Sequence, residues 1–171
     1  RAIINSTPAD DAKMSVIFGM DKKYNAQVIG LTMDKTGVPD SKDKRIELAA
    51  RIVAKAMECG INTEDLYLDP VVLPVNVAQA QAREVLEAIR EFRLLSDPAP
   101  YTVIGLSNVS QRTKQRSLIN RTFLTMAIAS GLSAAILDPL DRDLMDAMIA
   151  SELMLNKNIY CDSFLDAYRK K

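Results

Sequence analysis

The stretch Tyr101-Thr-Val-Ile-Gly-Leu-Ser-Asn-Val-Ser-Gln111 decides the fold of this chain of 171 residues. Its first half is a short apolar run rich in β-branched residues, which predicts a parallel strand buried on both faces. Small polar residues follow at once, namely Ser107, Asn108, Ser110 and Gln111. Both α/β barrels and open α/β sheets place their chemistry at the carboxyl ends of such strands. The alternative is that Asn108 and Ser110 are turn residues that cap the next helix.

The rest of the chain repeats this pattern of a strand followed by a helix. In addition to the strand that starts at Tyr101, we predict strands over 2–7, 26–33, 66–74 and 134–139. Helices are predicted over 10–24, from Asp40 or Ser41 to Gly60, and over 77–95, 118–130, 143–155 and 159–169. Strand–helix units in succession predict an α/β fold with a parallel sheet and right-handed crossovers.

Polar residues end strand after strand, which favours a barrel whose strand ends form a ring around one mouth. These residues are Asn5 and Ser6, Thr32 and Asp34, Asp69, Ser107 and Asn108, and Asp138. The glycines are isolated from one another, so the sequence has neither a phosphate-binding loop nor a dinucleotide fingerprint.

Composition excludes several classes of function. Lysine plus arginine equals aspartate plus glutamate and no basic run occurs, which argues against a nucleic-acid partner. No apolar stretch is long enough to span a membrane, and the first residues lack a signal-peptide layout. Two distant cysteines fit a reducing, cytoplasmic setting, and the absence of histidine excludes histidine bases and histidine-containing zinc sites. We therefore expect no protein-bound metal.

Six segments together resemble one family, in one register along the whole chain. They are Ile4-Asn-Ser-Thr7, Gly30-Leu-Thr-Met-Asp-Lys-Thr-Gly37, Tyr67-Leu-Asp-Pro70, Gly105-Leu-Ser-Asn-Val-Ser-Gln111, Ile119-Asn-Arg-Thr-Phe123 and Tyr160-Cys-Asp-Ser-Phe164. The family is the methyltetrahydrofolate:corrinoid protein methyltransferases of acetogens and related methylotrophic systems. The resemblance implies a parallel (β/α) TIM barrel of the dihydropteroate-synthase-like type. Residues 1–171 would be the C-terminal portion of this pterin-binding domain and supply strands four to eight, so we expect further residues, or a second chain, to complete the barrel.

The resemblance also implies roles for particular residues. Asn5 and Asp69 would hydrogen-bond the pterin ring, whose amino and ring N–H groups need acceptors. Asn108 would be the catalytic residue at N5 of the folate, where its amide would stabilise the transition state. Ser107, Gln111 and Arg116 would complete the substrate site. The alternatives are that Asp69 is a cap or loop residue, that Asn5 belongs to a helix cap and that Arg116 is a solvated loop charge.

The implied reaction moves a methyl group between methyltetrahydrofolate and the cobalt of a cobalamin that a corrinoid protein carries, with the corrinoid iron–sulfur protein as one candidate partner. A homodimer in the cytoplasm is also implied. Two other functions stay open, a dihydropteroate-synthase-like pterin enzyme and a non-catalytic folate-binding or interaction module. The sequence does not identify the corrinoid partner or the direction of methyl transfer.

Overall fold

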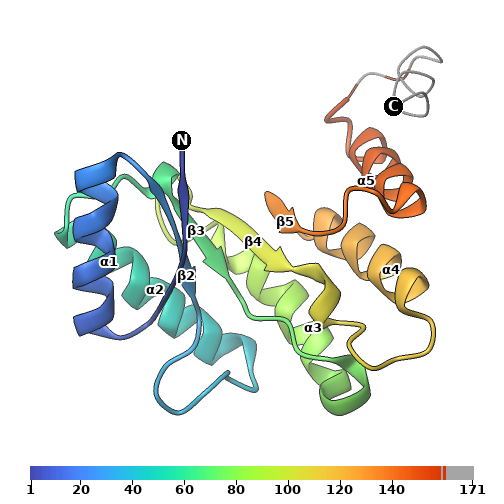
Figure 1. Ribbon diagram of the computed structural model, residues 1–171, viewed down its shortest axis with the longest axis horizontal. Coiled ribbons are helices and arrows are strands. Elements are labelled where there is room, and N and C mark those ends of the chain that lie inside the picture. Colours follow the sequence, from blue (N-terminus) through green and yellow to red (C-terminus); the bar gives the residue numbers. More distant parts are fainter. Residues whose placement is uncertain (159, 161–171) are drawn as a thin grey trace.

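In the computed structural model, which describes residues 1–158 and 160, the predicted alternation of strands and helices is confirmed (Figure 1). The strands are β1 (Ile3–Pro8), β2 (Gln27–Leu31), β3 (Leu66–Asp69), β4 (Tyr101–Gly105) and β5 (Ala134–Ile136). Each strand pairs in parallel with the next one along the chain, so the order in the sheet is the order in the sequence. This order is that of a TIM barrel, because a doubly wound sheet reverses its strand order.

The helices follow the strands and pack against their neighbours in sequence. They are α1 (Asp11–Tyr24), α2 (Lys42–Glu58), α3 (Val75–Phe92), α4 (Arg116–Ala129) and α5 (Arg142–Met154), with short 3₁₀ turns η1 (Thr63–Asp65) and η2 (Leu106–Asn108). Ser41 caps α2, since its hydroxyl accepts a hydrogen bond from the Lys44 N–H at 3.3 Å, and Gly60 follows the helix with a φ of +71°. The helix predicted over 159–169 lies outside the described residues, apart from Tyr160.

Several predicted strand ends were wrong, since β2 ends at Leu31 and β5 at Ile136, before the predicted ends at 33 and 139. The strand expected over 66–74 ends at Asp69, because Pro70 has no N–H to donate to a neighbouring strand and Val71 has a φ of +62°. Pro8 is the last residue of β1, one residue beyond the predicted strand. The cap of α1 is Asp10, whose carboxylate accepts a hydrogen bond from the Lys13 N–H at 3.0 Å.

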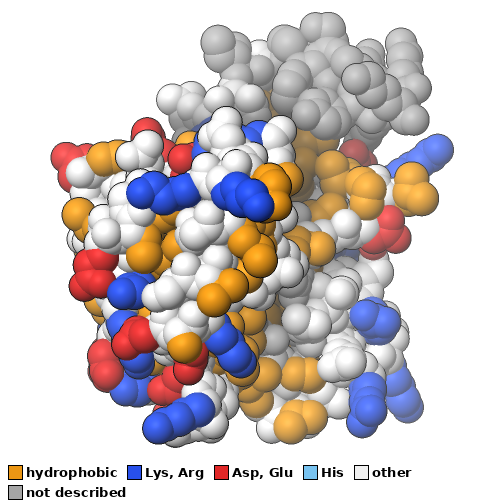
Figure 2. All heavy atoms as spheres, turned by 60° about the vertical axis from the view of Figure 1, so that its left-hand side comes forward, with side chains coloured by type: hydrophobic (Ala, Val, Ile, Leu, Met, Phe, Trp, Pro, Cys, Tyr) orange, Lys and Arg blue, Asp and Glu red, His pale blue; other side chains and the backbone are white. Residues whose placement is uncertain are grey.

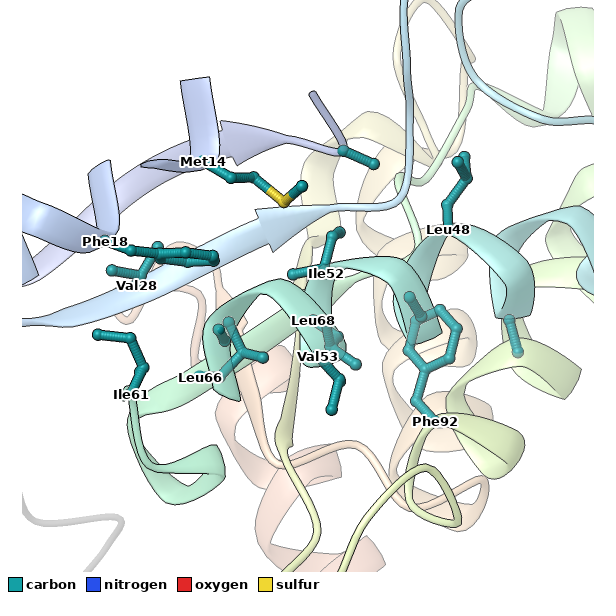
Figure 3. Packing of buried hydrophobic residues seen from close by; sticks show 14 residues of the cluster. Met14, Phe18, Val28, Leu48, Ile52, Val53, Ile61, Leu66, Leu68 and Phe92 are labelled. Atoms are coloured by element: carbon teal, nitrogen blue, oxygen red, sulfur yellow. The ribbon is translucent and has the colours of Figure 1, made fainter. Parts of the chain in front are cut away.

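The hydrophobic core lies between the sheet and the helices. Figure 3 shows side chains of α1, α2 and α3 converging with those of β2 and β3, as Phe18, Ile52 and Phe92 illustrate. The buried face of α2 includes Leu48, Ile52 and Val53, whereas Met57 is 59% exposed. A second cluster joins the other end of the sheet to α3, α4 and α5.

The opposite face of the sheet, which we call the inner face, carries the side chains that alternate with the core residues. The register places Asn5, Ile29, Tyr67 and Tyr101 on this face, and Asp69 two residues beyond Tyr67 shares it. The rings of Tyr67 and Tyr101 stack with centroids 5.1 Å apart. In Figure 2, hydrophobic side chains reach the surface across the middle of the molecule, whereas most of the acidic side chains in view lie towards its left.

Gly30 tests how tightly β2 packs on α2. A Cβ at this position would lie 2.7 Å from Cγ2 of Ile52, so Gly30→Ala should lower the free energy of unfolding by about 1–3 kcal/mol, as overpacking does. Urea denaturation measures the loss. Gly19→Ala in α1 is the control, because nothing lies within 4 Å of the added methyl group. It should raise stability by about 0.4–1 kcal/mol.

If the contact with Ile52 causes the loss, Ile52→Ala should make Gly30→Ala less costly, so that the double variant loses less stability than the sum of the single variants. Strict additivity would contradict this explanation.

Candidate functional site

Asp69 is the last residue of β3 and lies partly buried on the inner face. Its Oδ1 accepts a hydrogen bond from the Val71 N–H at 2.8 Å, and its backbone carbonyl accepts two from Thr32, one from the N–H and one from the hydroxyl. Burial raises the pKa of the Asp69 carboxyl to about 6, although the Val71 N–H opposes this change. Among the described residues, none donates to Oδ2. Asp69 therefore has one carboxylate oxygen held in place and one available to a ligand.

Asn5 lies on β1 with an exposed side chain, on the same face as Asp69. Because Asp10 caps α1, the interpretation of Asn5 as part of a helix cap is wrong. Its amide has no hydrogen-bond partner among the described residues and can both donate and accept. The structure thus places the two predicted pterin ligands on one face, without a hydrogen bond between them.

Asn108 belongs to η2, directly after the carboxyl end of β4. Its Nδ2 would lie 3.2 Å from a Cβ built on Gly105, so the amide folds back over the end of the strand and a larger residue at Gly105 would crowd it. Gly105 is an inner-face position, since it lies four residues after Tyr101. The Asn108 amide therefore lies at the carboxyl end of β4, and Asp69 lies at the carboxyl end of the neighbouring β3.

The loop after η2 is braced by Ser110, which is fully buried. The Ser110 hydroxyl donates to the Ser107 carbonyl and accepts from Nε of Arg116, each at 3.3 Å. Arg116, the first residue of α4, also donates to the Ser107 carbonyl at 3.5 Å. Ser110 therefore shapes the loop rather than capping α4, whose N-cap is Gln115. The side chains of Ser107 and Gln111 are exposed.

Residues that we did not assign from the sequence adjoin these positions. A cleft of about 330 Å³ opens between the ends of β4 and β5, with Ser107, Arg116, Asn120 and Asp138 in its lining. Among the described residues, none donates a hydrogen bond to the buried Oδ1 of Asn120. The buried Arg45, which contacts the loop after Asp69, was also missed. The spacing could have indicated its burial, because Arg45 lies three residues before Leu48 and seven before Ile52, on the same face of the helix.

Asp34 after β2 makes contacts within its own turn. Its Oδ1 accepts from the hydroxyl and the N–H of Thr36, and these hydrogen bonds, the hydroxyl foremost, hold the pKa of the Asp34 carboxyl below its ordinary value.

In the described part of the chain, no three acidic, cysteine or histidine side chains gather as metal ligands would. None of the helices described has the length and apolar character that crossing a membrane requires.

Comparison with known proteins places this site in a family. A model of the family described as pterin binding enzyme matches residues 1–138. The chain belongs to this family. It is similar to the methylcorrinoid:tetrahydrofolate methyltransferase of Eubacterium limosum, with 27% identity over 173 residues that cover 98% of this chain and 62% of the relative. Methionine synthase of Mycobacterium tuberculosis is 27% identical over 148 residues, which are 80% of this chain and 12% of that protein.

The fold of this pterin binding enzyme is also found among solved structures. A DHPS from Yersinia pestis, solved with a pterine-sulfa conjugate, superposes with a TM-score of 0.66 at 16% identity and covers 90% of this chain and 61% of that chain. The predicted α/β barrel fold and the pterin-binding family are thus confirmed. The roles of Asn5, Asp69, Ser107, Asn108, Gln111 and Arg116 stay predictions. The chain spans about three fifths of the E. limosum relative and of this structure.

Asp69 makes the stability of the fold depend on pH. Its pKa in the folded chain is raised from 3.8 to about 6, so its contribution is complete below pH 3.8 and is lost as the pH rises through 6. Asp69→Asn keeps an acceptor for the Val71 N–H but cannot ionise. The variant should therefore be more stable than the parent at pH 7.5 by about 1–3 kcal/mol, with a difference that shrinks towards pH 4.

Urea denaturation at several pH values measures this difference. Asp34→Asn is a control of opposite sign, because the pKa of Asp34 is lowered and its ionised form favours the fold. That variant should lose stability at pH 7.5 relative to low pH. A gain for Asp69→Asn that is the same at every pH would contradict the assignment of a raised pKa to Asp69.

Proposed function

We propose that this chain forms the C-terminal part of the pterin site of a methyltransferase. The reaction would move a methyl group between N5 of methyltetrahydrofolate and the cobalt of a corrinoid protein. The observation that carries the proposal is the free oxygen of Asp69 on the inner face of a pterin-binding fold, with Asn5 on the same face and the Asn108 amide at the end of the next strand. The E. limosum relative, whose name describes such a transfer, covers nearly the whole chain.

The pterin ring would be bound through its hydrogen-bond donors. An ionised carboxylate can accept from two parallel donors, and the ring N–H and the amino group of a pterin form such a pair. The Val71 N–H already occupies Oδ1 of Asp69 on one side and leaves its other lone pair and Oδ2 for the ring. Asn5 can add a donor and an acceptor from β1. Since Asp69 has a pKa of about 6, it is mostly ionised at neutral pH and ready to accept.

Asn108 would act on the bond that breaks. In the direction of methyl donation, the bond between N5 and the methyl carbon would break and its electron pair would stay on N5, which gains a proton from solvent. The reduced cobalt of the corrinoid protein would supply the electron pair of the new bond to the methyl carbon. A tertiary amine leaves poorly unless N5 is protonated or strongly hydrogen-bonded. An amide that bonds N5 more strongly in the transition state than in the ground state would lower the barrier without transferring a proton. The reverse direction passes through the same transition state.

The described sheet is open, because β1 and β5 are edge strands without a partner on their outer sides among the described residues. Several large apolar side chains of the inner face are about half exposed, among them Ile3 at 48% and Ile136 at 51%. Strands that pair with both edges would cover these side chains, so we propose that this portion supplies strands four to eight of a complete barrel. The expected homodimer stays a prediction.

One experiment separates this function from the alternatives. The complete protein would be mixed with methyltetrahydrofolate and a reduced corrinoid protein, and the corrinoid spectrum would be followed. A spectrum that changes from the reduced to the methylated form supports methyl transfer. A protein that binds the folate but leaves the spectrum unchanged would favour a DHPS-like enzyme or a non-catalytic folate-binding module.

Asn108→Ala should slow methyl transfer by roughly 10- to 1000-fold, the usual effect of removing one hydrogen bond to charge that develops in the transition state. Single-turnover rates from the corrinoid spectrum measure this loss, and folate affinity should fall by a smaller factor. Asn62→Ala is the control, because Asn62 is an exposed asparagine that precedes β3 at the opposite end of the sheet. An unchanged rate for Asn108→Ala would remove Asn108 from the mechanism.

Asp69→Asn should weaken pterin binding by about 1–3 kcal/mol, because an amide presents a donor where the ring also has a donor. Fluorescence quenching by the folate gives the affinity of parent and variant at pH 7.5. The difference should shrink as the pH falls below 6, where Asp69 becomes protonated and accepts less well. Equal affinities at pH 7.5 would leave Asp69 with a local role in its own loop.

A further inference from the structure

Arg45 is a cation with no exposed surface, near the start of α2. Its guanidinium donates three hydrogen bonds, from Nε to the Pro70 carbonyl at 2.8 Å, from Nη2 to Oε1 of Gln81 at 2.7 Å, and from Nη1 to the Ser41 carbonyl at 3.3 Å. None of these acceptors is a carboxylate. Burial lowers the pKa of Arg45, while the carboxylates of Glu84 and Asp40 act in the opposite direction without hydrogen-bonding it.

Such an arrangement is a poor source of stability. A buried charge loses its hydration, and hydrogen bonds to neutral acceptors offset less of that loss than an ion pair with good geometry would. An apolar residue at this position of α2 would pack against the same core as Leu48 and Ile52 without that loss. What the guanidinium supplies instead is a rigid fork with donors in fixed directions.

The fork reaches the peptide group that joins Pro70 to Val71. The carbonyl of this group accepts from Arg45, and its N–H donates to Oδ1 of Asp69 at 2.8 Å. Because a peptide group is planar, fixing the direction of its carbonyl also fixes the direction of its N–H. Val71 has a φ of +62°, which a β-branched residue adopts only when its surroundings impose it. The hydrogen bond from Arg45 is one such constraint.

The other two hydrogen bonds of Arg45 hold the fork itself. Ser41 lies in the loop after β2, and Gln81 lies on α3 and donates through Nε2 to the Asp40 carbonyl at 2.7 Å. Arg45 is therefore connected to the loops after β2 and β3 and to the helix that follows β3. A shift of any of these elements would therefore also move the Pro70–Val71 peptide group.

We propose that Arg45 is a positioning residue for Asp69, which it holds towards the inner face through the Pro70–Val71 peptide group. The inference deepens the proposed function, since it explains what orients the carboxylate that binds the pterin. It does not depend on that function for its test, because the orientation of Asp69 can be observed without a ligand.

The test is a pH titration of the complete, ligand-free protein by NMR, with the parent and Arg45→Met compared. In the parent, the side-chain carboxyl carbon of Asp69 and the amide of Val71 should titrate together near pH 6. In Arg45→Met, the pKa of Asp69 should rise by roughly one pH unit, because the hydrogen bond that favours the ionised form is weakened. The response of the Val71 amide should also shrink to less than about half, because the N–H no longer faces the carboxylate.

Leu48→Ala is the control, because Leu48 is also buried on α2 but its side chain cannot hydrogen-bond the Pro70–Val71 peptide group. It should lower the unfolding midpoint and leave both titrations unchanged. Should Arg45→Met fail to fold, Arg45→Lys keeps the charge and lacks the fork, so the response of the Val71 amide should again shrink. Parent-like titrations in the folded variant, or the same shift in Leu48→Ala, would overturn the proposal.

Pterin affinity separates this inference from the proposed function. If Arg45→Met shifts both titrations while Asp69→Asn leaves pterin affinity unchanged, the positioning of Asp69 stands and its role as a pterin ligand fails. If Asp69→Asn loses affinity while the titrations of Arg45→Met match the parent, the pterin ligand stands and the role of Arg45 fails.

Discussion

The structure depends on the alternation of side chains along parallel strands that lie in chain order. In β3, Leu66 and Leu68 point into the core beneath the helices, while Tyr67 and Asp69 point to the inner face. The same alternation directs Gly30 of β2 towards Ile52 and Asn5 of β1 away from the helices. One face therefore supplies the hydrophobic energy of folding and the other is left for a ligand, with each strand contributing to both.

Charges buried near the mouth work against stability. Ionised Asp69 and the guanidinium of Arg45 both lose hydration, and burial shifts the pKa of each towards its neutral form. The surrounding fold offsets this with neutral hydrogen-bond partners, the Val71 N–H for Asp69 and the carbonyl groups of Pro70 and Ser41 for Arg45. A fold selected for stability alone would place apolar residues here, so the two charges indicate that the loop after β3 is shaped for binding.

How much could be predicted from the sequence depended on how local each signal was. The strand–helix order, the start of α2 near Ser41 and the place of Asp69 at the end of a strand follow from short patterns, and each was predicted. The buried face of α2 was harder to predict, because Ala50 and Met57 fit the helical period as well as Leu48 and Ile52 do, and only the packing of α2 on β2 separates the two faces. The contacts of Arg45 join residues 25 and 36 positions apart, which no local pattern encodes. The position of Asn108 over Gly105 depends likewise on the turn geometry of η2.

The hydrogen bond from the Val71 N–H to Asp69 connects the conformation of the loop after β3 with the protonation state of the Asp69 carboxyl. Desolvation alone would move the pKa of Asp69 above its ordinary value, and a carboxyl that is protonated at neutral pH accepts poorly from the donors of a pterin. The Val71 N–H favours the ionised form, and it does so before any ligand arrives. In the proposed site, a pterin that brings two further donors would lower the pKa again, so its binding at neutral pH would require little proton release. The Pro70–Val71 peptide group thus contacts Arg45 through its carbonyl and the Asp69 carboxylate through its N–H.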